Sequence, residues 1–277
     1  MKPLFTFQQF INEQFKPLQE SGVLGLSIDE FFQNIEDRTI IFFDTETTGF
    51  KPRLKYRQIT QLAAVALDPV NNSIVDSFSE TLVLNAETLK QIELERETPP
   101  ESGLSIDQIL NFSGYDFSKA SKIPLEAAEQ FVSWVNGFKN PLLVAQNAQF
   151  DMNFMNTLMK QNRVDFQVLD FLKFNKYYLE PILLNLSRNG VEEASAILAQ
   201  LYDPKRNKHS FAQQKLGKAF SVGSGGAHIA LHDAVQLAEL AQKVFDFIRR
   251  HRGSIGSDIA SDYGRARKSW KNRKKSR

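Results

Sequence analysis

Residues 39–49 read TIIFFDTETTG, and this stretch is expected to organise the fold of the chain. The run Thr39–Phe43 is β-branched and aromatic without polar alternation, which predicts a strand buried on both faces. Alternate residues of a strand share a face, so Asp44 and Glu46 are expected on the same side. Two carboxylates this close at a buried edge resist ionisation unless a cation lies between them. A hard divalent cation is the natural candidate, and the alternative is a solvated acidic turn closed by Gly49.

The composition is that of an ordinary globular protein, because 42% of the 277 residues are apolar and 24% are charged. The chain has no cysteine, which excludes disulfides, thiolate nucleophiles and zinc–thiolate sites. Residues 1–18 are too polar for a signal peptide, and no apolar run approaches about 18 residues. We therefore expect a cytoplasmic protein with no membrane partner.

The net charge of +2 conceals an uneven distribution of charge. Residues 252–277 contain nine basic and two acidic residues, whereas residues 1–251 contain 25 basic and 30 acidic residues. An acidic body suggests metal-binding carboxylates, and a basic tail suggests contact with a polyanion. We expect the tail to be disordered and to act as a nucleic-acid tether, with a mere solubility tail as the alternative.

Hydrophobic spacing predicts an α/β fold with a mixed central sheet flanked by helices. Strands are expected at 39–43, 59–67, 73–84, 141–145 and 167–170. Helices are expected from Ser105 and at 124–138, 151–160, 171–179, 190–201, 209–219 and 229–249, with 85–122 otherwise irregular. Short links make the first three strands antiparallel, and later alternation of helix and strand favours parallel pairing. The predicted parts are a helical extension at 1–37, one domain at 38–251 and the tail at 252–277.

Three separate stretches carry the polar residues that the predicted elements do not explain. They are DTETTG at 44–49, NAQFD at 147–151 at a strand-to-helix junction, and HIALHD at 228–233 at the start of the last helix. This ordered set resembles the DEDDh-type 3′–5′ exonuclease family, which includes the epsilon proofreading subunits of bacterial DNA polymerase III, RNase T and oligoribonuclease. The motifs match as D-x-E-T-T-G, N-A-x-F-D and H-x4-D, and the resemblance extends from residue 38 to 250. It implies an RNase H-like fold.

The resemblance also implies two divalent cations, Mg²⁺ or Mn²⁺, with Asp44 as the bridging ligand. Two ions about 3.5–4 Å apart can neutralise both the attacking and the leaving oxygen of a phosphodiester. Carboxylate and water ligands suit these small hard ions. The ligands implied are Asp44, Glu46, Asp151 and Asp233.

His228 stands five residues before Asp233, the spacing of the general base in this family. Histidine is suited to accept a proton from water near neutral pH. His232 is a competitor, but its position next to Asp233 turns it about 100° around the helix, so we expect a peripheral role. Ile229 stands where the tyrosine branch of the family would need Tyr.

Further residues are expected to contact the substrate: Thr47, Thr48, Asn147, Phe150, Gln61, Lys51, Arg53 and Arg57. Thr47 and its neighbouring backbone match the family's contact to the terminal 3′ nucleotide, with a turn-stabilising hydroxyl as the alternative. Asn147 is expected to support the substrate strand or the first motif, and Phe150 is expected in the core rather than at the substrate. The basic loop 51–57 could follow a single strand by phosphate contacts and stacking, or could be a solvated loop.

The resemblance implies a metal-dependent 3′–5′ exonuclease that hydrolyses single-stranded DNA to 5′-mononucleotides, in proofreading or end trimming. A DNA polymerase is a candidate partner. One alternative is an exoribonuclease of the same family. The other is a non-catalytic nucleic-acid-binding or polymerase-docking module, which has no need of four carboxylates and a histidine in these motifs.

Overall fold

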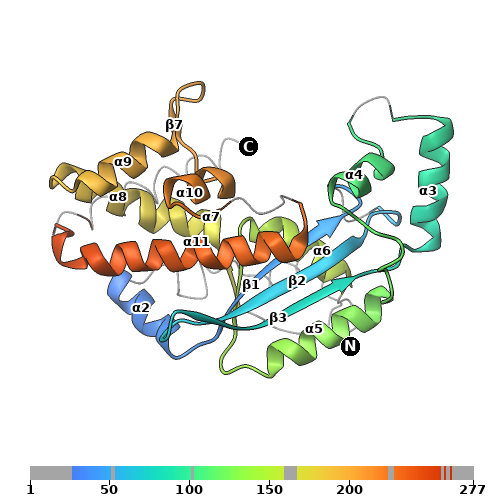
Figure 1. The fold of residues 1–277 in the computed structure, drawn as a ribbon, viewed down its shortest axis with the longest axis horizontal. Helices are drawn as coiled ribbons and strands as arrows, with labels where there is room; N and C mark the ends of the chain where they lie inside the picture. The colour runs from blue at the N-terminus through green and yellow to red at the C-terminus, as the bar shows by residue number, and fades with distance from the viewer. Residues whose placement is uncertain are drawn as a thin grey trace, which may run out of the picture.

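A computed structural model describes residues 27–50, 54–100, 103–158, 167–223, 228–256, 259 and 263. Its centre is a five-stranded mixed sheet in the order β3-β2-β1-β4-β5 (Figure 1). The strands are β1 Ile40–Thr47, β2 Ile59–Asp68, β3 Ser73–Thr81, β4 Leu142–Ala145 and β5 Val168–Asp170. β1 and β3 pair antiparallel with β2, whereas β4 pairs parallel with β1 and β5. The predicted α/β fold with three antiparallel strands first is confirmed.

The described helices cover both faces of the sheet (Figure 1). They are α2 Ile28–Glu36, α3 Ala86–Glu97, α4 Ile106–Phe112, α5 Pro124–Asn136, α6 Ala148–Leu158, α7 Phe171–Phe174, α8 Glu180–Arg188, α9 Glu192–Leu201, α10 Gln213–Ala219 and α11 Ala230–His251. A π-helical segment, Asn175–Leu179, joins α7 to α8, and a 3₁₀ turn, Arg252–Ser254, follows α11. A short hairpin joins α9 to α10 through β6 Tyr202–Asp203 and β7 Lys208–His209.

Two helices differ from the expectation drawn from the sequence. The region 85–122 was predicted to be irregular before Ser105, but it contains α3, which buries only Thr88 and Ile92. So small an apolar face leaves little periodicity to detect, and the Asn85 side chain instead caps the helix by accepting a hydrogen bond from the Thr88 backbone N–H. The other is α8, which lies between the predicted helices at 171–179 and 190–201, where the sequence predicts no helix.

Strand β1 separates two hydrophobic clusters, which explains its uninterrupted apolar run. Ile40 and Phe42 pack with α11 on one face, and Ile41 and Phe43 pack with α5 and α6 on the other. Both faces are therefore buried, as predicted for residues 39–43. By alternation, Asp44 and Glu46 continue the face that α11 covers.

The ends of the predicted domain are attached to the same core. Helix α2 begins with a capping box at Ser27, and its Phe31 ring lies 4.8 Å from the Phe174 ring. After α11, the side chains of Ile255, Ile259 and Tyr263 pack against the cluster that contains Ile40. The core therefore extends beyond both predicted boundaries, 37/38 and 251/252. Residues 1–26 of the predicted extension and the basic part of the tail lie outside the described residues.

Membrane insertion finds no support in the part of the chain that the structure describes. Within it, every helix is either too short or too polar to cross a bilayer.

Candidate active site

The carboxyl end of β1 has an open edge. Pairing between β1 and β4 ends at Phe42 and Val144, whereas β1 continues to Thr47. On the other edge β2 still pairs with β1, and a bulge interrupts the register between Glu46 and Thr47. Asp44 and Glu46 thus lie in the part of β1 that extends beyond its pairing with β4, where another element can approach.

Helix α6 brings Asp151 to that open edge. The helix starts at Ala148, immediately after β4, and Asp151 lies in its first turn. The Asp151 Oδ1 atom accepts hydrogen bonds from the Thr45 backbone N–H at 3.2 Å and from the Thr45 hydroxyl at 2.9 Å. These bonds satisfy a strand N–H that β4 no longer reaches, and they fix a carboxylate of which only 5% is exposed.

Helix α11 brings the third motif to the same place. The Asp233 Oδ2 atom accepts a hydrogen bond of 2.9 Å from the His228 backbone N–H. His228 has a φ of +70°, a left-handed conformation that is uncommon outside glycine and often marks functional sites. Glu46, His228 and Asp233 each offer one ligand atom, and these atoms lie within 4.8 Å of one another. The carboxylate oxygens of this group suit a small hard divalent ion such as Mn²⁺ or Mg²⁺, and the imidazole lies beside them.

Burial raises the pKa values of the four motif carboxylates, and the charges of other motif carboxylates add to this effect at Asp44 and Glu46. Burial first, and then the charges of Asp151, Glu46 and Asp233, raise the pKa of Asp44 well above its usual range. Burial, followed by the charges of Asp233 and Asp151, raises the pKa of Glu46 to about 7. Burial likewise raises the pKa of Asp151 to about 7, against hydrogen bonds from Thr45, and burial also raises the pKa of Asp233. Acids arranged in this way need a cation among them in order to be charged together.

One contributor to this site escaped the sequence analysis. Asp170, at the end of β5, is 6% exposed, and its charge helps to raise the pKa of Asp151. Its own carboxylate accepts a hydrogen bond from the Lys173 backbone N–H at 2.8 Å and lies 3.3 Å from the Lys173 ammonium group. Asp170 lies at a strand-to-helix junction similar to the one that precedes Asp151. This similar position was the feature of the sequence that could have identified Asp170 as a candidate.

The threonines of the first motif use their hydroxyls within the loop. Thr47 donates to the Gly49 carbonyl at 2.9 Å. Thr48 is fully buried, donates to the Tyr56 carbonyl at 3.1 Å and accepts from the Gln58 backbone N–H at 2.9 Å. Such contacts are those expected of a hydroxyl that stabilises a turn. Both hydroxyls therefore stabilise the loop that follows Glu46.

Arg57 also closes this loop. Its guanidinium donates a hydrogen bond to the Thr48 carbonyl and lies over the Tyr56 ring, 5.1 Å from its centroid. Gly49 has a φ of +147°, a conformation that residues with side chains rarely adopt, so the backbone favours glycine here; a Cβ atom would also lie 2.6 Å from the Arg57 Nη1 atom, which would have to move. Lys51 and Arg53 of the predicted basic loop lie outside the described residues.

The remaining predicted substrate residues take three different positions. Gln61 is 8% exposed and bonds to the protein backbone on two sides. Asn147 is exposed and immediately precedes α6. Phe150 is half-buried, with its ring 5.3 Å from Phe154 in the core and 6.3 Å from the exposed ring of Phe50. His232 is exposed on α11, as expected for a peripheral residue.

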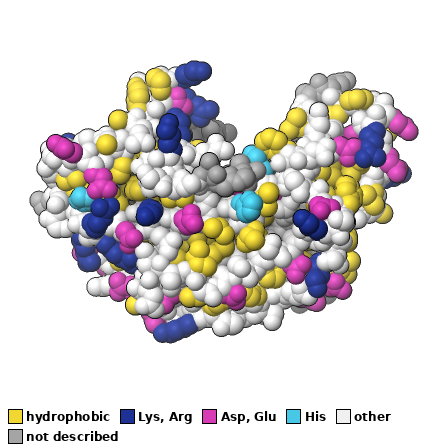
Figure 2. Space-filling model, in the orientation of Figure 1, with side chains coloured by type: hydrophobic (Ala, Val, Ile, Leu, Met, Phe, Trp, Pro, Cys, Tyr) yellow, Lys and Arg dark blue, Asp and Glu magenta, His cyan; other side chains and the backbone are white. Residues whose placement is uncertain are grey.

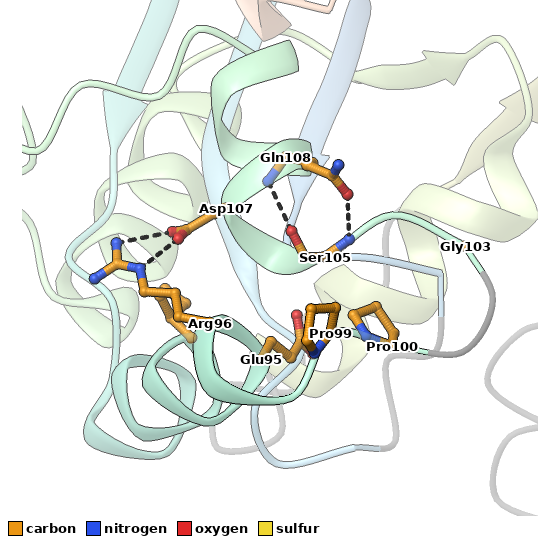
Figure 3. Close-up of a pocket in the computed structure, with 9 residues that line it drawn as sticks. Glu95, Arg96, Pro99, Pro100, Gly103, Ser105, Asp107 and Gln108 are labelled. Atoms are coloured by element: carbon orange, nitrogen blue, oxygen red, sulfur yellow. Dashed lines mark hydrogen bonds and ion pairs between the residues drawn. The ribbon is translucent and has the colours of Figure 1, made fainter.

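The surface around the site is concave. Figure 2 shows a hollow between the side of the molecule formed by α3 and α4 and the side that carries α9 and β7, with histidine side chains at its floor. A separate cavity of about 360 Å³ lies between α3 and α4 (Figure 3). Its charged residues are already paired, since the Arg96 Nε atom lies 2.5 Å from Asp107 and Glu95 accepts a bond from the Ile106 backbone N–H. None of its lining residues belongs to the three motifs, so this cavity is not part of the candidate site.

Comparisons with known proteins agree with this fold. No protein-family model matches the chain. The chain is 32% identical over 127 residues, 45% of its length, to the PolC-type DNA polymerase III of Staphylococcus epidermidis. It is 28% identical over 232 residues, 83% of its length, to the PolC-type DNA polymerase III of Listeria innocua. The chain spans only 7% and 13% of the lengths of these two relatives.

The solved structures include one informative neighbour. The zinc-bound complex of Escherichia coli exonuclease I with single-stranded DNA matches with a TM-score of 0.50 at 17% identity, over 77% of this chain and 43% of that chain. At this identity the match concerns the fold alone, and it confirms the predicted RNase H-like mixed sheet.

Proposed function

The chain resembles the DEDDh-type 3′–5′ exonucleases in its fold and in its three motifs, and from this premise we propose that it is a metal-dependent 3′–5′ exonuclease acting on single-stranded DNA. The observation that carries the proposal is the convergence of the motifs. The charges of Asp151 from α6 and Asp233 from α11 raise the pKa values of Asp44 and Glu46 on β1, and His228 lies beside Glu46 and Asp233. A binding module has no use for four carboxylates that oppose their own ionisation.

The four carboxylates fit the metal ions that such a reaction requires. Asp44, Glu46, Asp151 and Asp233 would hold the divalent cations, Mg²⁺ or Mn²⁺. When bound, the two ions supply charge neutralisation at both oxygens of the in-line displacement. The hydrogen bonds from Thr45 hold Asp151 in place before any ion arrives, so the ligand is preorganised.

His228 is the residue proposed to accept the proton of the attacking water. Its backbone is fixed by the bond to Asp233, and its ring lies on the same side as the Glu46 and Asp233 carboxylates. Two observations favour DNA as the substrate. The curated relatives are DNA polymerases, and the matched exonuclease I structure contains single-stranded DNA. A polymerase partner remains a prediction that co-purification with the replicative polymerase of the source cell would test.

The test is shortening of a 5′-labelled single-stranded oligonucleotide. We expect a ladder of products and 5′-mononucleotides with Mg²⁺ or Mn²⁺, no reaction with chelator, and no reaction of Asp44→Asn. A blocked 3′ end should stop degradation, since continued cleavage would indicate an endonuclease. A matched RNA distinguishes the exoribonuclease alternative. If neither oligonucleotide shortens with either metal at neutral pH, the proposal fails.

A further inference from the structure

The end of α4 contacts the residue proposed as the general base. Phe112 is the last residue of α4, and its ring centroid lies 4.2 Å from that of His228, with an angle of 39° between the planes. Rings at this separation are in direct contact. Phe112 is 64% exposed, whereas Ile106 and Leu110 of the same helix form a small core cluster. Phe112 therefore contributes little to that core, and its main aromatic contact is with His228.

Two further contacts join the same segments. The Gln61 Nε2 atom donates to the Ser113 carbonyl at 2.9 Å, and its Oε1 atom accepts from the Ala230 backbone N–H at 3.2 Å. A Cβ atom at Gly114 would lie 3.7 Å from the Ile229 side chain. Residues 112–114 and 228–230 thus lie side by side, with a buried glutamine between them.

The His228 ring needs such support. Its backbone N–H bonds to Asp233, but that bond does not orient the imidazole. Among the residues that the structure describes, no hydrogen bond to the His228 ring is found. Catalytic histidines are usually oriented by a third group that bonds to the ring. At His228, the contact that can orient the imidazole is the one with the Phe112 ring.

We propose that Phe112 is a positioning residue for His228, and that the end of α4, held by Gln61, fixes the imidazole for proton transfer. This inference rests on the proposed function of His228 as the general base. Phe112 acts through the histidine, so its loss should slow the chemical step and leave substrate binding largely intact. If the exposed ring instead stacked on a nucleobase, its loss would weaken binding.

The test separates these effects by single-turnover kinetics and by binding measured with Ca²⁺ in place of Mg²⁺. Phe112→Ala should lower the single-turnover rate by about ten- to a hundredfold, because a small misplacement of a catalytic group has effects of this size. Phe112→Trp, which keeps an aromatic ring, should restore most of the rate. Phe117→Ala is the matched control: Phe117 is 58% exposed, follows the same helix and contacts Tyr115 rather than His228.

Two readouts distinguish positioning from a general structural effect. In a His228→Ala background, Phe112→Ala should cause little further loss of rate, because the residue acts only through the histidine. The four histidines of the chain allow the His228 ring signal to be assigned by NMR, and Phe112→Ala should shift that signal in the metal-free protein.

Each other outcome overturns the inference. These outcomes are an unchanged single-turnover rate, a loss confined to binding, an equal loss in Phe117→Ala, or an undiminished effect in the His228→Ala background. An inactive wild-type protein would refute the proposed function instead, and the NMR shift would still report whether the ring contact exists.

Discussion

Replacing Asp151 by Asn should stabilise the metal-free protein at alkaline pH while abolishing its activity. The Asn side-chain oxygen can still accept both hydrogen bonds from Thr45, so the substitution removes the buried charge and leaves the contacts. Removal of a carboxylate ligand should prevent metal-dependent hydrolysis. Stability and activity should therefore change in opposite directions.

The size of the effect follows from the pKa. Burial raises the pKa of Asp151 from its usual 3.8 to about 7. At ~1.4 kcal/mol per pKa unit, the ionised carboxylate destabilises the fold by on the order of 4 kcal/mol above pH 7. The folded protein keeps this proton up to about pH 7, whereas the unfolded chain releases it near pH 4, so stability falls as pH rises through that window. The free energy of unfolding of wild type should therefore decrease by on the order of 3 kcal/mol between pH 5 and pH 8.

The assay is urea unfolding at pH 5, 6, 7 and 8 in the presence of chelator. Asp151→Asn should unfold at higher urea than wild type at pH 8, and the difference should shrink toward pH 5. Asp76→Asn changes an exposed carboxylate on β3 and serves as the control. Added Mn²⁺ at pH 8 should stabilise wild type more than Asp151→Asn. A variant less stable than wild type at pH 8, or a difference that does not depend on pH, would refute the reasoning.

Three further predictions concern the surroundings of the site. Gly49→Ala should lower the free energy of unfolding by about 1–3 kcal/mol, because a residue with a side chain is strained at a φ of +147°, and a thermal melt unchanged from wild type would contradict this. Gln61→Met should destabilise the protein by about 1–3 kcal/mol and slow single-turnover hydrolysis, because it leaves the Ser113 carbonyl and the Ala230 N–H unpaired in the interior. An active, fully stable variant would show that these two hydrogen bonds of Gln61 are dispensable. Truncation after Tyr263 removes eight basic residues and spares the side chains that pack on the core, so it should weaken DNA binding and flatten its salt dependence, whereas an unchanged salt slope would exclude a role of the tail in binding.

Much of the fold followed from local patterns. The apolar run at 39–43 and the alternation of later helices and strands predicted the mixed sheet, because burial on both faces requires an uninterrupted apolar strand. Helix α3 was not predictable in this way, since its few buried residues leave no periodic signal and its cap and tertiary contacts support it.

The sequence by itself predicted which residues are candidates for the chemistry, because Asp44, Glu46, Asp151, His228 and Asp233 stand in three recognisable motifs. Only the tertiary structure decided how they are held. Asp151 meets Thr45 across 106 residues of chain because β4 ends before β1 does. Gln61 meets Ala230 across 169 residues and also bonds to Ser113, so its side chain joins two segments that are far apart in the sequence. Such contacts depend on where each strand stops and which helix end arrives beside it, and these are properties of the packed fold that no local pattern encodes.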